Sequence, residues 1–185
     1  MLLAESVASD AEMGQGVTRT IRFDKELDEA LQTIGRHEKM SVNAIVNKLV
    51  REYVEWDRYN EKIHIMEISP SVLTMLMERY PLDEARALGR TMAKDLVRPS
   101  IEQIFVDYTF DNTVEFLRRF SHYTKRFDFE DSVEGHKHVM MLRHSLGLKW
   151  SAYYAGMLQE ILEEGLGIKI EQTMGAEFCA AKFEL

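Results

Sequence analysis

The sequence lacks several features that are typical of extracellular and membrane proteins. Its 185 residues include one cysteine, Cys179, so no intrachain disulfide framework is expected. No run of eighteen apolar residues occurs, which excludes a conventional transmembrane helix. Residues 1–4 are too short for the apolar core of a signal peptide, and no charged segment precedes them. These absences together predict a cytoplasmic protein with no membrane partner.

Familiar catalytic motifs are also missing. The sequence has no glycine-rich phosphate loop, no Gly-x-Ser-x-Gly elbow and no His-Glu-x-x-His zinc helix. Cys179 lies in an apolar stretch, where a buried thiol behaves as a small hydrophobic group. Asp107, Asp111 and Glu115 are too scattered to assign as an acid–base pair. We therefore expect no enzyme, no catalytic residue and no cofactor.

What the sequence does contain is a short alternating segment at residues 17–23. Ile21 and Phe23 share one face of the predicted strand, and the other face carries Thr18, Thr20 and Arg22. Two helices follow directly, so the strand has no partner within its own domain. An unpaired strand exposes backbone N–H and C=O groups, and the simplest partner for them is the same strand of a second copy of the chain. The resulting two-stranded antiparallel ribbon fits the major groove of DNA.

The two helices after the strand carry clear start signals. Asp24 is placed to cap the first helix, whose apolar residues recur at helical spacing. Gly35 is expected to end that helix, and Ser41 to cap the second. The second helix presents an apolar stripe wide enough for a dimer core, formed by Ile45, Val46, Leu49, Val50, Tyr53 and Val54.

Strand, helix, turn and helix within about forty residues resemble the ribbon-helix-helix superfamily, the MetJ, Arc and CopG group of repressors. The resemblance covers about residues 17–59, under a quarter of the chain. It implies a dimeric DNA-binding domain at residues 16–60, in which the ribbon reads double-stranded DNA. The base contacts that it implies are Thr18, Thr20 and Arg22. The phosphate contacts comprise Arg19, expected at the edge of the ribbon, and the start of the second helix, Ser41, Val42 and Asn43.

The chain is acidic overall, so DNA binding would require a local basic patch. The chain has 31 Asp and Glu against 23 Lys and Arg, a net charge of −8, and residues 1–60 hold 11 acidic and 8 basic residues. DNA binding usually rests on a basic patch. Here that patch has to be local, built from Arg19 and Arg22 with nearby lysines and doubled by the dimer. We therefore expect weak non-specific affinity and marked salt sensitivity.

The rest of the chain predicts an α+β domain at residues 61–185, with antiparallel strands and several helices. Residues 1–15 have the composition of a disordered tail. Strands are predicted at residues 62–68, 101–108, 127–129, 136–143, 168–174 and 177–183. Helices are predicted from Ser69–Pro70, from Asp83 up to Pro99, from Asp111 to Phe120, and over residues 149–164.

Two ligand classes are compatible with the second domain. His136 and His138 would share one face of a strand, and His144 has the same parity, so a transition metal could bind. This layout resembles the nickel regulator NikR, although Cys179 lies far from the histidines. Alternatively, an apolar pocket for a small organic molecule could form from Phe120, Tyr123, Phe127, Trp150, Tyr153, Tyr154 and Met157. Aromatic residues at helical spacing are also ordinary core, and such a core could simply hold dimers together or pair them into a homotetramer.

The sequence thus favours a transcription regulator with a sensing or oligomerisation domain. An antitoxin-like protein-interaction module is the main alternative, and a metal-responsive regulator is another. An antitoxin usually contacts its partner through a short segment that folds on binding. Residues 61–185 have instead the composition of a folded domain, which favours the regulator.

Overall fold

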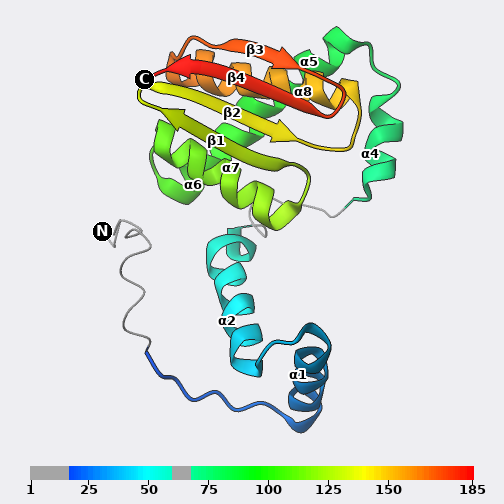
Figure 1. The fold of residues 1–185 in the computed structure, drawn as a ribbon, viewed down its shortest axis with the longest axis vertical. Helices are drawn as coiled ribbons and strands as arrows, with labels where there is room; N and C mark the ends of the chain where they lie inside the picture. The colour runs from blue at the N-terminus through cyan, green and yellow to red at the C-terminus, as the bar shows by residue number, and fades with distance from the viewer. Residues whose placement is uncertain (1–16, 60–67) are drawn as a thin grey trace. The chain divides into compact units, whose positions relative to one another are not determined.

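The computed structural model describes residues 17–59 and 68–185, and it divides into two compact units, residues 1–49 and 50–185 (Figure 1). The predicted disordered tail and nearly all of the predicted strand at 62–68 lie outside the described residues. Across the two described ranges, no helix combines the length and apolar character needed to cross a bilayer.

The N-terminal region contains the two predicted helices. Helix α1 spans Lys25–Glu38, and the Asp24 carboxylate caps it by accepting a hydrogen bond from the Leu27 N–H at 2.9 Å. Helix α2 spans Val42–Glu52, and the Ser41 hydroxyl accepts from the Ala44 N–H at 3.1 Å. Both predicted caps are confirmed. Residues 17–24 carry no regular secondary structure in the single chain, so the β-ribbon stays a prediction.

Gly35 does not end α1, contrary to the sequence-based expectation. It lies inside the helix, which continues to Glu38 and ends with Lys39 in the left-handed region at φ 56°. A Cβ on Gly35 would come 2.6 Å from the Met40 carbonyl oxygen. This glycine therefore serves the close return of the loop against the helix, rather than its termination.

The second unit includes the last residues of α2 and the π-helical turn η2 (Tyr53–Asp57), and it is mixed helix and sheet, which confirms the α+β class. Its helices are α4 (Pro70–Met77), α5 (Leu82–Met92), η3 (Ala93–Val97), α6 (Arg98–Phe105), α7 (Phe110–Thr124), α8 (Leu148–Gln159) and η4 (Glu160–Gly165). Its strands are β1 (Asp128–Glu134), β2 (Lys137–Arg143), β3 (Glu171–Met174) and β4 (Phe178–Glu184).

The four strands form one antiparallel sheet in the order β1-β2-β4-β3, and the helices lie on one of its faces (Figure 1). Side chains alternate along each strand, so one face of β2 and β4 turns to the helices. That face is almost fully buried and supplies Met140, Leu142, Cys179, Ala181 and Phe183 to the core. The polar opposite face carries ion pairs such as Lys137–Glu184 at 3.9 Å.

Helices α5 and α8 cross at two glycines. A Cβ on Gly89 would lie 1.9 Å from the Tyr153 carbonyl oxygen, and one on Gly156 would lie 2.0 Å from the Arg86 carbonyl oxygen. Each helix thus presses its backbone against the glycine of the other. The absence of two side chains sets how closely these helices approach, and it fixes the position of Tyr153 and its neighbours on α8.

Three predictions in this region are wrong, one about the type of an element and two about where a helix begins or ends. Residues 101–108 are not a strand, because α6 covers Arg98–Phe105 and buries Ile101 completely. Ile101, Ile104 and Phe105 also fit helical spacing, and burial against the core decides between the two periods. Pro99 does not end its helix either. It lies in the first turn of α6, directly after the wider turn of η3, where its missing N–H is tolerated.

The third wrong prediction concerns the start of α5. Pro81 occupies the capping position and Leu82 is the first helical residue, so Asp83 lies within the first turn. There its carboxylate interacts favourably with the positive end of the helix dipole. The predicted hairpin turn near residues 134–135 is confirmed, with Gly135 at φ 63°.

Candidate functional site

The predicted base-reading residues lie on an accessible segment. Thr18, Thr20 and Arg22 are all exposed, as is Arg19. Within residues 17–59 and 68–185, neither arginine forms a hydrogen bond or an ion pair. The guanidinium groups are thus available to a phosphate or to a guanine edge, and their assignment to DNA contacts stays a prediction.

The start of α2 has the local geometry of an anion site. The Ser41 hydroxyl is used as the helix cap, and the Ser41 carbonyl accepts from the Ile45 N–H at 3.0 Å. No acceptor in the described part of the chain takes the N–H of Val42 or Asn43. These two donors point along the helix dipole and could bind a phosphate.

The apolar stripe of the two helices is only partly covered in a single chain. Leu31 and Ile45 are buried, at 5% and 6% exposure. Four apolar side chains are half-buried, namely Phe23, Met40, Val42 and Val46. Seven further apolar side chains are exposed, namely Ile21, Leu27, Ile34, Leu49, Val50, Tyr53 and Val54. So many exposed apolar side chains over about forty residues are characteristic of an association surface.

The second unit contains a cavity of about 270 Å³ lined by residues of α7, α8, the α5–α6 stretch and the loop between α7 and β1. Six of the seven residues proposed from the sequence line it, namely Phe120, Phe127, Trp150, Tyr153, Tyr154 and Met157. Tyr123 does not; its ring stacks on Trp56 and its hydroxyl donates to Glu55 at 2.5 Å. The cavity also includes residues that the sequence did not single out: Met92, Leu96, Val97, Ser100, Phe116, Leu117 and Arg126.

Polar groups reach this apolar space at two places. The Ser100 hydroxyl is satisfied, because it donates to the Leu96 carbonyl at 2.7 Å. The phenols of Tyr153 and Tyr154 lie near Arg126, whose guanidinium carbon is 5.7 Å above the Phe120 ring centre. Burial raises the pKa of both phenols, and the Arg126 charge partly offsets that effect. Both hydroxyls are therefore neutral donors at physiological pH.

The three histidines do not form a metal site. No cluster of three or more His, Cys, Asp or Glu suited to a metal occurs among the described residues. His136 lies in the β1–β2 turn and is exposed, while His138 lies in β2, where Asp131 faces it at 3.2 Å and the Phe183 ring stacks on it. Cys179 is buried on β4, and burial raises the pKa of its thiol to about 12, which disfavours the thiolate form.

His144 is a structural residue with both ring nitrogens engaged. Nδ1 accepts from the Leu146 N–H at 3.2 Å, so Nε2 carries the proton and donates to the Ser151 hydroxyl at 3.1 Å. Burial lowers the pKa of His144 below its usual 6.5. The unfolded chain therefore binds a proton at a higher pH than the folded protein does.

This shift predicts that the protein loses stability as pH falls below about 6.5. Above that value the contribution of His144 is complete, and it declines towards the folded pKa by at most about 1.4 kcal/mol per pH unit. Urea unfolding between pH 7.5 and 5 measures the slope. A His144→Gln variant is expected to be less stable at neutral pH but to show a shallower slope, and an unchanged slope would contradict the assignment.

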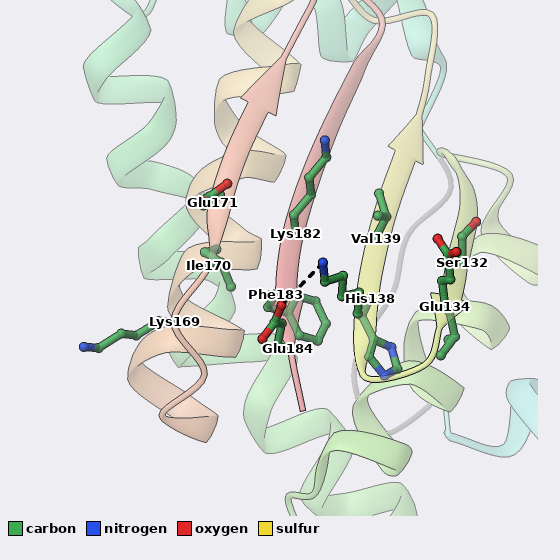
Figure 2. A pocket seen from close by; sticks show the side chains of 12 residues that line it. Ser132, Glu134, His138, Val139, Lys169, Ile170, Glu171, Lys182, Phe183 and Glu184 are labelled. Carbon is green, nitrogen blue, oxygen red and sulfur yellow. Dashed lines mark ion pairs between the residues drawn. The ribbon is translucent and has the colours of Figure 1, made fainter.

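A second hollow lies beside the ends of β1, β2 and β4, and it is shown in Figure 2. It is an open groove of about 790 Å³ lined by Glu134, Glu171 and Glu184 together with Lys137, Lys169 and Lys182. The two signs of charge are balanced, and Lys137 forms an ion pair with Glu184, its neighbour on the adjacent strand, drawn as the dashed line in Figure 2. The groove therefore favours no particular charge of ligand, and the enclosed aromatic cavity is the better candidate.

Comparisons with known proteins add no identification. No protein-family model, no curated protein sequence and no solved structure matches the chain. The arguments on function therefore rest on the residues and their geometry.

Proposed function

We propose that the protein is a sequence-specific DNA-binding transcription regulator that acts as a homodimer. The observation that carries the proposal is the combination found in residues 17–59. A short polar segment without regular structure precedes two capped helices, and their apolar side chains stay exposed in the single chain. Pairing with a second copy covers these side chains and completes a two-stranded ribbon, whose polar face enters the major groove.

The second unit supports a regulator more than an antitoxin. Its core is continuous and contains fully buried side chains from α6, α7, α8 and the sheet, such as Ile101, Leu117, Met140 and Leu158. A partner-binding segment that folds only on binding has no such core. We therefore assign residues 68–185 to ligand sensing or to assembly of the regulator. The absence of a His or Cys cluster in the described ranges gives no support to the metal-responsive alternative.

The first test of this function is selection of DNA by the purified full-length protein from a random duplex library. We expect enrichment of a two-fold symmetric site, because a dimeric ribbon presents the same face to each half-site. Recovery of random sequence only, at every salt concentration, would refute sequence-specific binding.

The contacts can be separated by comparing two arginines of the same segment. Arg22→Ala should lose roughly 1–3 kcal/mol of discrimination at one base position of each half-site, since it lies on the predicted base-reading face. Arg19→Ala is the matched control and should weaken specific and random DNA about equally. It should also reduce the salt slope by about two, because the dimer carries two copies. Fluorescence anisotropy with matched and mutated sites measures both effects, and equal losses for the two variants would contradict the assignment.

A further inference from the structure

The hydroxyl of Tyr154 is a buried polar group without a hydrogen-bond partner among the described residues. The side chain is 3% exposed, and its ring is held by Phe127, His144, Trp150 and Tyr153 at centroid distances of 5.1–5.7 Å. Buried hydroxyls are nearly always hydrogen-bonded, because an unsatisfied one loses its interaction with water. Tyr154 lines the aromatic cavity, so a molecule in that cavity could supply the acceptor.

The walls of the cavity favour a flat apolar ligand. Aromatic rings from α7, α8 and the segment before β1 surround it, and Phe120 and Phe127 stack at 5.7 Å. Its volume of about 270 Å³ equals roughly nine water molecules, which suits a single aromatic ring with a short substituent. Rings of this kind pack well against other rings in offset or edge-on arrangements.

The polar edge of the cavity favours a negative charge on that ligand. Arg126 lies on the cavity wall beside two neutral phenols that can only donate or weakly accept. A guanidinium has five N–H donors and can bind more than one acceptor, so an anion in the cavity could be one of them. Among residues 17–59 and 68–185, no carboxylate side chain lines the cavity, and Arg126 is the basic residue of its lining.

We propose that this cavity binds a small aromatic carboxylate, with its ring among Phe120, Phe127 and Trp150 and its carboxylate accepting from the Tyr154 hydroxyl beside Arg126. The proposal concerns binding by the second unit and stands whether or not residues 17–59 bind DNA. If the protein is a regulator, the same ligand class becomes its effector.

The test uses the full-length protein and isothermal titration calorimetry. The probes are benzoate, phenylacetate and 3-phenylpropionate at up to about 1 mM, with the corresponding amides and with hexanoate as comparisons. We expect saturable binding of at least one aromatic carboxylate at one per chain. Its amide should bind at least about tenfold more weakly, because a charge-assisted hydrogen bond is lost. Hexanoate should also bind more weakly, since it lacks the ring.

Two variants locate the site and one controls for folding. Tyr154→Phe removes only the hydroxyl and should lower affinity about tenfold, the loss expected for one hydrogen bond to a charged group. It should unfold at the same or a higher temperature, because the hydroxyl has no partner to lose. Tyr108→Phe is the control: its hydroxyl donates to the Ile161 carbonyl at 3.1 Å, so that variant should be less stable yet bind normally. Leu96→Trp should block binding, since Leu96 lines the cavity and is 39% exposed at its rim.

The outcomes that overturn the proposal are equally specific. No binding by any aromatic carboxylate would reject the ligand class, and equal binding by acid and amide would reject the role of charge. Binding that survives both Tyr154→Phe and Leu96→Trp would place the ligand elsewhere. The calorimetry contains no DNA. A negative result here therefore rejects the ligand proposal alone, and a negative DNA selection rejects the DNA-binding proposal alone.

Discussion

Replacement of Gly89 by alanine should remove most of the stability of the second unit. The new Cβ would lie 1.9 Å from the Tyr153 carbonyl oxygen, which belongs to the backbone and cannot rotate away. Helices α5 and α8 would have to separate, and every side chain packed between them would lose contacts. We expect a loss of about 4 kcal/mol or more, at the high end for single substitutions. Alanine at an exposed helical glycine would instead gain about 1 kcal/mol.

Urea unfolding followed by circular dichroism measures this loss. Gly156→Ala should behave in the same way, because its Cβ would approach the Arg86 carbonyl to 2.0 Å. Gly135→Asn is the control, since nothing lies within 4 Å of its Cβ and asparagine tolerates the φ of 63° found there. That variant should stay within about 0.5 kcal/mol of the parent. A stable Gly89→Ala variant would show that the two helices do not cross so closely.

A second large effect is expected at Leu49, on the exposed apolar stripe of α2. Its side chain is 53% exposed in the single chain, so Leu49→Glu should be harmless if the protein works as a monomer. If Leu49 lies in a dimer core, the substitution buries a charge and should raise the dimer dissociation constant at least about 100-fold. Binding to the selected DNA site should fall with it, because a single ribbon strand cannot hold its geometry.

Asn47→Glu is the matched control because it makes the same change of charge on the same helix. Asn47 is exposed and donates to the Asn43 carbonyl at 2.8 Å within α2. Its substitution should change the dimer dissociation constant less than about tenfold, as is usual for an exposed surface charge. Sedimentation equilibrium gives both constants. An unchanged dimer dissociation constant for Leu49→Glu would refute dimerisation through this stripe, and a monomeric variant that still binds its site would show that DNA binding needs no dimer.

Local signals in the sequence were sufficient for many of the elements and failed where tertiary context decides. Asp24, Ser41 and Ser69 cap helices as predicted, because a cap depends on a few neighbouring residues. The strand predicted at residues 101–108 failed, because a short apolar stretch fits both periods until its burial is known. The prediction that Pro99 ends a helix failed for a related reason, since the π-helical turn before it cannot be recognised in the sequence.

The residues of the cavity could likewise be predicted from the sequence only in part. Six of its aromatic and methionine residues could be named from the sequence, five of them on two predicted helices and Phe127 on a predicted strand. Leu96, Ser100 and Arg126 could not, because only the packing of the α5–α6 stretch and the loop after α7 brings them to the same space. The strand predicted to pair with residues 17–23 belongs to a second copy, so the fold of one chain cannot show that pairing.

The sheet order β1-β2-β4-β3 also governs when the second unit can fold during synthesis. β4 is the last strand in sequence, yet it pairs with β2 on one side and β3 on the other. The sheet therefore cannot close until residues 178–184 have left the ribosome. At about 5–20 residues per second, roughly 6 to 25 seconds separate the emergence of residue 59 from that of residue 184. Throughout this interval the N-terminal helices can already meet other nascent copies. The strand β2 has not yet paired with β4, so its apolar face is still incompletely covered.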